Sequence, residues 1–196
     1  RPIRLPTIPQ QNNNTSLRVG TLNVQSMYTT TTNKLRKIDN ILLNLPKEKF
    51  NVLSLQETLH EGCILQEVNN NALTGKYSIF DIKYKPSDEE NKNYTRGLVM
   101  LVDSDLSPIQ RQEYSNEDDG NMLAVSCLHN EEKVLMFNIY RNPSDKSRTN
   151  KALKNCHNNI NKALLSGEFD SIVVCGDFNT KPSDLAQLLP TTTHYR

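Results

Sequence analysis

Residues 171–179 read SIVVCGDFN, and the interpretation of the whole chain starts from this stretch. Its first half is a short run of β-branched apolar residues, which predicts a buried strand. The strand leads directly into a glycine, the carboxylate of Asp177 and the amide of Asn179. A buried strand that ends in this way places polar groups at the rim of a sheet, where catalytic groups usually lie.

Two earlier apolar runs end in the same manner. Residues 17–22 (LRVGTL) lead into Asn23, and residues 52–55 (VLSL) lead into Gln56 and Glu57. If the three strands lie in packed sheets, an amide and two acids converge at one edge. The sequence therefore predicts a polar site at that edge.

Each of these polar residues has a chemical interpretation and a simpler one. A carboxylate at a sheet rim, such as Glu57, suits Mg²⁺, which prefers hard oxygen ligands; alternatively, Glu57 is an ordinary exposed acid. Asp177 and Asn179 are two residues apart, so in an extended turn both can face the same way, one activating water and one donating to a phosphate. Asn23 is either a site residue or an asparagine satisfied within a turn.

A fourth apolar run ends at Tyr140, which is followed by Arg141 and Asn142. A phenol, a cation and an amide at one strand end are able to contact a phosphodiester. Tyr140 alternatively belongs to the core, with its hydroxyl at the surface. Arg96 opens another apolar run and is either a substrate contact or a solvated charge.

Composition limits the classes of protein that fit. The 196 residues are enough for one domain with a sizeable core, and the net charge of +1 provides no global field toward nucleic acid or membrane. No apolar run approaches the roughly 20 residues that cross a bilayer. The sequence contains no phosphate-binding glycine motif and no serine or cysteine in a nucleophile-elbow setting.

The four cysteines lack metal-binding spacing, and we expect buried thiols in a reducing compartment, nuclear or cytoplasmic. They are Cys63, Cys127, Cys156 and Cys175.

The order of elements predicts two packed sheets flanked by helices, in one domain over residues 17–196 that follows a disordered lead at residues 1–16. Strands are expected at residues 17–23, 51–56, 77–84, 98–102, 109–113, 122–128, 134–140 and 171–175. A hairpin turn is expected at residues 129–132. Helices are expected at residues 33–45, 61–68, 147–165 and 182–189.

Five motifs occur in the order and rough spacing of the endonuclease/exonuclease/phosphatase superfamily, which includes deoxyribonuclease I and the apurinic/apyrimidinic endonucleases. They are LRVGTLN (17–23), LSLQET (53–58), RGLV (96–99), FNIY (137–140) and VCGDFN (174–179). Within that group the chain most resembles the endonuclease domain of non-LTR retrotransposons, because IYRNPS (139–144) precedes a helix and GDFN. The tail PTTTHY (190–195) is similar to a Pro-Thr-His stretch of those domains.

The resemblance implies a deoxyribonuclease I-like, four-layer α/β-sandwich, in which two mainly antiparallel sheets are flanked by helices. It implies Mg²⁺ (or Mn²⁺) held by Glu57 with help from Asn23. Tyr140 would contact the scissile phosphate, Asp177 would orient or deprotonate the attacking water, and Asn179 would bind the phosphate and help to place Asp177. The implied reaction is a nick in DNA that leaves a free 3′-hydroxyl, and implied partners include other retroelement domains such as a reverse transcriptase.

The chain departs from the pattern in three places. It has no terminal Ser-Asp-His segment, so the domain resembles a form truncated at its C-terminus, and His194 does not replace the missing histidine. The stretch between Asn179 and residue 190 is short, and Pro143 stands where relatives of the apurinic type carry an asparagine. Two alternatives therefore remain: an inactive copy that serves as a binding or structural module, and the same fold acting on RNA 3′ ends or phosphoinositides.

Overall fold

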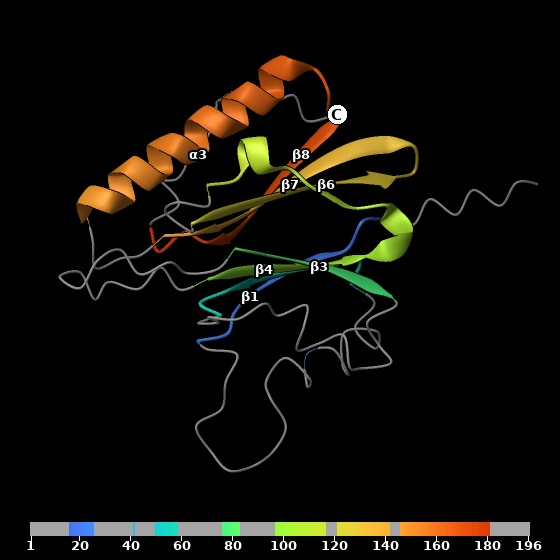
Figure 1. Cartoon of the computed structure of the whole chain (residues 1–196), viewed down its shortest axis with the longest axis horizontal. Helices are drawn as coiled ribbons and strands as arrows, with labels where there is room; N and C mark the ends of the chain where they lie inside the picture. The colour runs from blue at the N-terminus through green and yellow to red at the C-terminus, as the bar shows by residue number, and fades with distance from the viewer. Residues whose placement is uncertain are drawn as a thin grey trace, which may run out of the picture.

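The computed structural model describes residues 16–25, 41, 50–58, 76–82, 97–116, 121–141 and 146–180, and the structural statements below concern this part of the chain. Two four-stranded sheets pack face to face, with a long helix over one of them (Figure 1). The first sheet, sheet A, has the strand order β1-β2-β4-β3. Its strands are β1 (Val19–Asn23), β2 (Val52–Gln56), β3 (Tyr77–Ile82) and β4 (Leu98–Asp103).

The second sheet, sheet B, has the order β5-β6-β7-β8. Its strands are β5 (Ile109–Gln110), β6 (Met122–His129), β7 (Glu132–Tyr140) and β8 (Ser171–Asp177). Helix α3 (Lys146–Ser166) connects β7 to β8 and covers the outer face of sheet B (Figure 1). In each sheet one parallel pair, β1–β2 or β7–β8, is joined to antiparallel neighbours.

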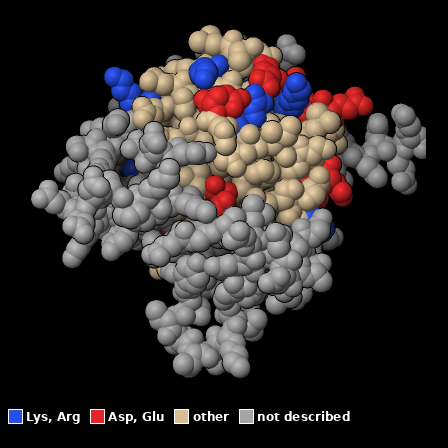
Figure 2. Space-filling view, viewed as in Figure 1, with Lys and Arg blue, Asp and Glu red and all other residues tan. Residues whose placement is uncertain are grey.

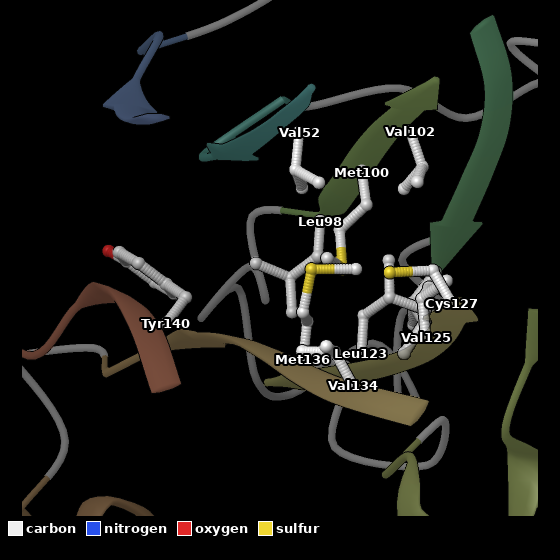
Figure 3. Packing of buried hydrophobic residues seen from close by; sticks show 11 residues of the cluster. Val52, Leu98, Met100, Val102, Leu123, Val125, Cys127, Val134, Met136 and Tyr140 are labelled. Carbon is white, nitrogen blue, oxygen red and sulfur yellow. The ribbon is translucent and has the colours of Figure 1, made fainter. Parts of the chain in front are cut away.

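Three apolar clusters explain why the central strands read as continuous apolar runs. One fills the space between the sheets, one lies on the outer face of sheet A, and one lies between sheet B and α3. Every residue of β2 is buried. A strand that is buried on both faces does not alternate between apolar and polar residues. Figure 3 shows the cluster between the sheets, where side chains of β2 and β4 meet those of β6 and β7.

The β6–β7 hairpin turns at Asn130 and Glu131, at the place that the sequence predicts. Their φ values of 50° and 69° are those of a two-residue turn that matches strand twist. The prediction of a strand over residues 109–113 is wrong in its second half. β5 ends at Gln110, and a 3₁₀ turn, η2 (Gln112–Tyr114), follows. The turn buries Tyr114 near α3.

The predicted fold class is confirmed: two mainly antiparallel sheets form an α/β-sandwich. The expected helix at residues 147–165 and the other seven strands are also present; β8 extends to Asp177, and the last two residues expected in β3, 83 and 84, lie outside the described residues. The expected helices at residues 33–45, 61–68 and 182–189 and the lead at residues 1–16 fall outside the described residues, apart from Ser16 and the helical residue Ile41. No helix of the described part is long and apolar enough to span a bilayer.

Candidate active site

The carboxyl ends of β1 and β2 in sheet A meet those of β7 and β8 in sheet B. Both pairs are parallel, and each brings two of the predicted site residues to the same edge. In sheet A, Asn23 is paired with Gln56, which precedes Glu57; in sheet B, Tyr140 is paired with Asp177. Residues up to 154 positions apart in the chain are thereby joined by hydrogen bonds.

Asn23 links the two carboxylates. Its side-chain nitrogen donates to Glu57 Oε1 at 2.9 Å and to Asp177 Oδ2 at 2.8 Å, and its oxygen accepts from the backbone N–H of Gln25 at 3.1 Å. One amide therefore holds an acid from each sheet, and its own orientation is fixed by the backbone. This is the arrangement that the three strand ends predict.

Glu57 is 7% exposed and also accepts a hydrogen bond from the Tyr140 hydroxyl, at 3.1 Å. Its φ of 55° lies in the left-handed region, which costs a non-glycine residue about 1–2 kcal/mol. Backbone strain of this kind concentrates at functional sites, where the surrounding contacts enforce it. Here the strained turn places the carboxylate at the rim, in contact with Asn23 and Tyr140.

The loop after β8 holds the second carboxylate. The backbone N–H of Asn179 donates to Asp177 Oδ1 at 3.1 Å, so both oxygens of Asp177 have a donor. The Asn179 side chain does not point to the same partners: its nitrogen donates to the Arg141 carbonyl at 2.8 Å. Asn179 thus helps to place Asp177 through its backbone, and its contact with a phosphate stays a prediction.

A second polar layer lies beneath the site, one or two residues before each strand end. Gln56 donates to Thr21 Oγ1 at 3.0 Å and to Asn138 Oδ1 at 2.7 Å. Asn138 in turn donates to the backbone carbonyls of Leu55 and Val99, at 3.0 and 3.1 Å. A side chain of sheet B is thus bonded to two strands of sheet A, which fixes the sheets relative to each other directly below the site.

Cys175 and Ser54 extend this layer, with 3.1 Å between the sulfur and the hydroxyl oxygen, and the thiol donates to the Phe137 carbonyl. Burial raises the pKa of the Cys175 thiol, and the hydrogen bond from Ser54 opposes this rise. The thiol therefore stays protonated at neutral pH. Together with Cys127 and Cys156, it is free of disulfide bonds, as predicted; Cys63 lies outside the described residues.

The sequence predicted some members of this arrangement and missed others. Asn23, Glu57, Tyr140 and Asp177 form one hydrogen-bonded group, whereas Arg96 and Asn142 lie outside the described residues. The second layer was missed, although its signal is present: polar residues stand at strand positions where apolar ones would otherwise be buried.

The donor set suits a hard divalent cation. It offers two carboxylates, and Mg²⁺ in proteins is commonly held by one or two carboxylates together with waters and substrate phosphate. Within the described ranges no cluster of three His, Cys, Asp or Glu side chains forms a metal cage. A cation here would be held by Glu57, as the resemblance implies, whereas the Asn23 oxygen accepts from the Gln25 N–H and the Asn23 nitrogen faces the carboxylates.

Several solved structures share the arrangement of the sheets. The endonuclease domain of TRAS1, a telomere-specific non-LTR retrotransposon, matches with a TM-score of 0.50 at 14% identity, over 83% of this chain and 60% of that one. AP endonuclease LMAP from Leishmania major matches with a TM-score of 0.53 at 18% identity, over 82% and 54%. These structures share the two packed sheets of the deoxyribonuclease I-like sandwich that the sequence resemblance implies.

A third structure, a humanized D. rerio TDP2, matches with a TM-score of 0.54 at 15% identity, over 87% of this chain and 66% of that one. The chain thus spans between about half and two thirds of the length of these three structures. At such identities the likeness is one of fold. No protein-family model and no curated protein sequence matches the chain.

Proposed function

We propose that the chain is a metal-dependent phosphodiesterase domain that nicks DNA, of the kind that retroelements carry, and that it works in the nucleus or cytoplasm beside domains such as a reverse transcriptase. The observation that carries this proposal is the Asn23 bridge between the carboxylates of Glu57 and Asp177. Hydrolysis of an anionic diester requires positive charge on the phosphate oxygens and a positioned water, and this edge has residues for both.

The residues divide the chemistry between them. Mg²⁺ or Mn²⁺, held by Glu57, would supply the positive charge, and Asn23 would help by holding the Glu57 carboxylate in place. Asp177, whose two oxygens are held by Asn23 and the Asn179 N–H, orients the attacking water and accepts its proton. The hydroxyl of Tyr140, which is anchored on Glu57, lies at the same edge and contacts the phosphate.

DNA is bound through contacts near the site rather than through the overall charge of the protein, because the net charge is only +1. On the face seen in Figure 2, acidic and basic side chains of the described residues are interspersed and no large patch of one sign is visible. Arg96 and Asn142 are the proposed substrate contacts near the site.

Nicking of supercoiled plasmid with Mg²⁺ or Mn²⁺ tests the proposal, and the two ends of β8 supply a matched pair of variants. Asp177→Asn removes the proton acceptor, so we expect the rate to fall roughly 10²- to 10⁴-fold. Asp170→Asn makes the same change just before β8, where the Asp170 side chain accepts from the Lys133 backbone N–H, and we expect no change. Chelation by EDTA should abolish nicking.

Three results would contradict this proposal. Nicking that persists in Asp177→Asn removes the assigned role of Asp177. DNA binding without nicking, at high protein and with either metal, favours a binding module. Release of phosphate from inositol phosphates, or trimming of RNA 3′ ends, without nicking favours the same fold with another substrate.

A further inference from the structure

Arg141 is tied to the loop that carries Asp177. Its backbone N–H donates to the Asp177 carbonyl at 2.9 Å, and its guanidinium Nη1 donates to the Asn179 carbonyl at 2.8 Å. In return, the Asn179 side chain donates to the Arg141 carbonyl at 2.8 Å. Three hydrogen bonds therefore join the residue just after β7 to this part of β8 and its loop, one to the last residue of β8 and two to Asn179.

The loop requires such support because regular strand pairing stops at Asp177. Gly176 has a φ of 138° and Asn179 a φ of 43°, so the backbone departs from strand geometry on both sides of the carboxylate. Asn179 holds one oxygen of Asp177 through its N–H, and Asn23 holds the other. Whatever fixes Asn179 therefore also fixes the direction of the Asp177 carboxylate.

The guanidinium is oriented by the protein. Its Nη1 is bonded to Asn179, and its Nε is buried and has no acceptor among the described residues. A buried N–H without a partner is unfavourable, so the position of the side chain is set by its other contacts. These contacts are to the loop rather than to another charge.

We propose that Arg141 is a positioning residue: by clamping Asn179 it holds the Asp177 carboxylate in the direction in which it acts on water. This inference rests on the proposed function for its catalytic consequence, whereas the clamp itself is a property of the fold. It differs from the contact with a substrate phosphate that a cation at this place suggests, because it acts on turnover and leaves substrate affinity unchanged.

Steady-state nicking kinetics of two variants test the catalytic consequence. Arg141→Met removes the guanidinium, and a misdirected carboxylate should lower kcat roughly ten- to a hundredfold with KM within about twofold. Arg141→Lys, whose ammonium is able to reach one carbonyl, should recover part of the loss. Arg111→Met is the matched control, because Arg111 is bonded to Glu113 and Glu168 at the opposite end of β8 and should leave both constants unchanged.

A rise in KM at constant kcat would show that Arg141 binds substrate and would overturn the proposal, as would unchanged kinetics. Amide hydrogen exchange separates this outcome from a failure of the proposed function. In Arg141→Met the Asn179 amide should exchange at least about tenfold faster, while the Phe137 amide in β7 should be unaffected, showing that the variant is folded. If the native chain does not nick DNA, the proposed function fails, and unchanged Asn179 exchange would overturn the clamp independently.

Discussion

The two ends of the space between the sheets are filled by different kinds of side chain. At the end opposite the site, which we call the far end, the side chains are apolar: Val52, Val102, Cys127 and Val134. At the site end, Thr21, Gln56 and Asn138 form hydrogen bonds below the candidate active site. Figure 3 shows Tyr140 lying apart from the far-end side chains, toward the site.

The difference teaches how one sandwich combines stability with a fixed geometry. Apolar burial contributes about 25 cal/mol per Å² and has no preferred direction, so the far end stabilises the fold and tolerates changes of shape. A buried hydrogen bond contributes only about 1 kcal/mol net, yet leaving its partner unpaired costs more than that. The site end therefore contributes less to stability but specifies where each strand end lies.

The largest effect is expected when a side chain is added at the site end of β8. A Cβ at Gly176 would lie 1.9 Å from the Ile139 carbonyl oxygen, at a φ of 138° that L-residues rarely adopt. Gly176→Ala should thus lower the free energy of unfolding by at least about 3 kcal/mol. Gly167, just before β8 on the far-end side, also has a positive φ but nothing within 4 Å of its Cβ position, so Gly167→Ala should cost only about 1–2 kcal/mol.

Urea unfolding of the two glycine variants measures this difference. Equal losses would mean that backbone conformation alone determines the cost and that the close packing of β8 against β7 at the site end is not rigid. A larger loss for Gly167→Ala would reverse the comparison.

The second effect concerns the polar layer. Asn138→Leu keeps the branched shape and the number of side-chain heavy atoms but removes the acceptor of Gln56 and the donor to two carbonyls, so we expect a loss of about 2–3 kcal/mol. Met136→Leu makes an apolar exchange two residues earlier on β7 and should cost less than about 1.5 kcal/mol. Urea unfolding midpoints measure the loss of stability in each variant, and native far-UV circular dichroism checks that both are folded. Similar losses would show that the polar layer is not required for stability.

The same contrast explains what the sequence could and could not predict. Strands were predictable because apolar runs such as VLSL in β2 are the signature of strands buried on both faces. The convergence of Asn23, Glu57, Tyr140 and Asp177 followed from where these strands end. Both inferences use only local sequence and the geometry of sheets.

The pairing of side chains within the polar layer was not predictable, because the bond between Gln56 and Asn138 joins residues 82 positions apart on different sheets. The placement of one sheet relative to the other cannot be read from the pattern of apolar and polar residues along either strand. The 3₁₀ turn at η2 was missed for a related reason. A strand was expected over residues 109–113, but Arg111 bonds to Glu168, which is distant in sequence, and Tyr114 packs edge-on against Phe169.

The smallest effect concerns pH and the thiols at the two ends. Burial raises the pKa of Cys127 from its ordinary 9.0 to about 11, whereas at Cys175 the Ser54 hydrogen bond partly opposes the rise. Above pH 9 the unfolded chain loses a thiol proton that the folded chain keeps, so the folded state becomes less stable as pH rises toward 11. This stability is fully present below pH 9.

Urea midpoints at pH 7.5, 9.0 and 10.5 measure the alkaline loss, and variants separate the two thiols. Cys127→Ala, at the far end, should reduce the alkaline loss of stability more than Cys175→Ala at the site end. The reason is that Cys127 lies in an apolar cluster, whereas the Ser54 hydroxyl is able to donate to a Cys175 thiolate. Tyrosine and lysine titrate in the same range but are common to all three proteins, so the difference between variants isolates each thiol. A greater reduction of the alkaline loss in Cys175→Ala would show that the Ser54 hydroxyl does not stabilise the thiolate and that a charge is less favourable at the site end than at the far end.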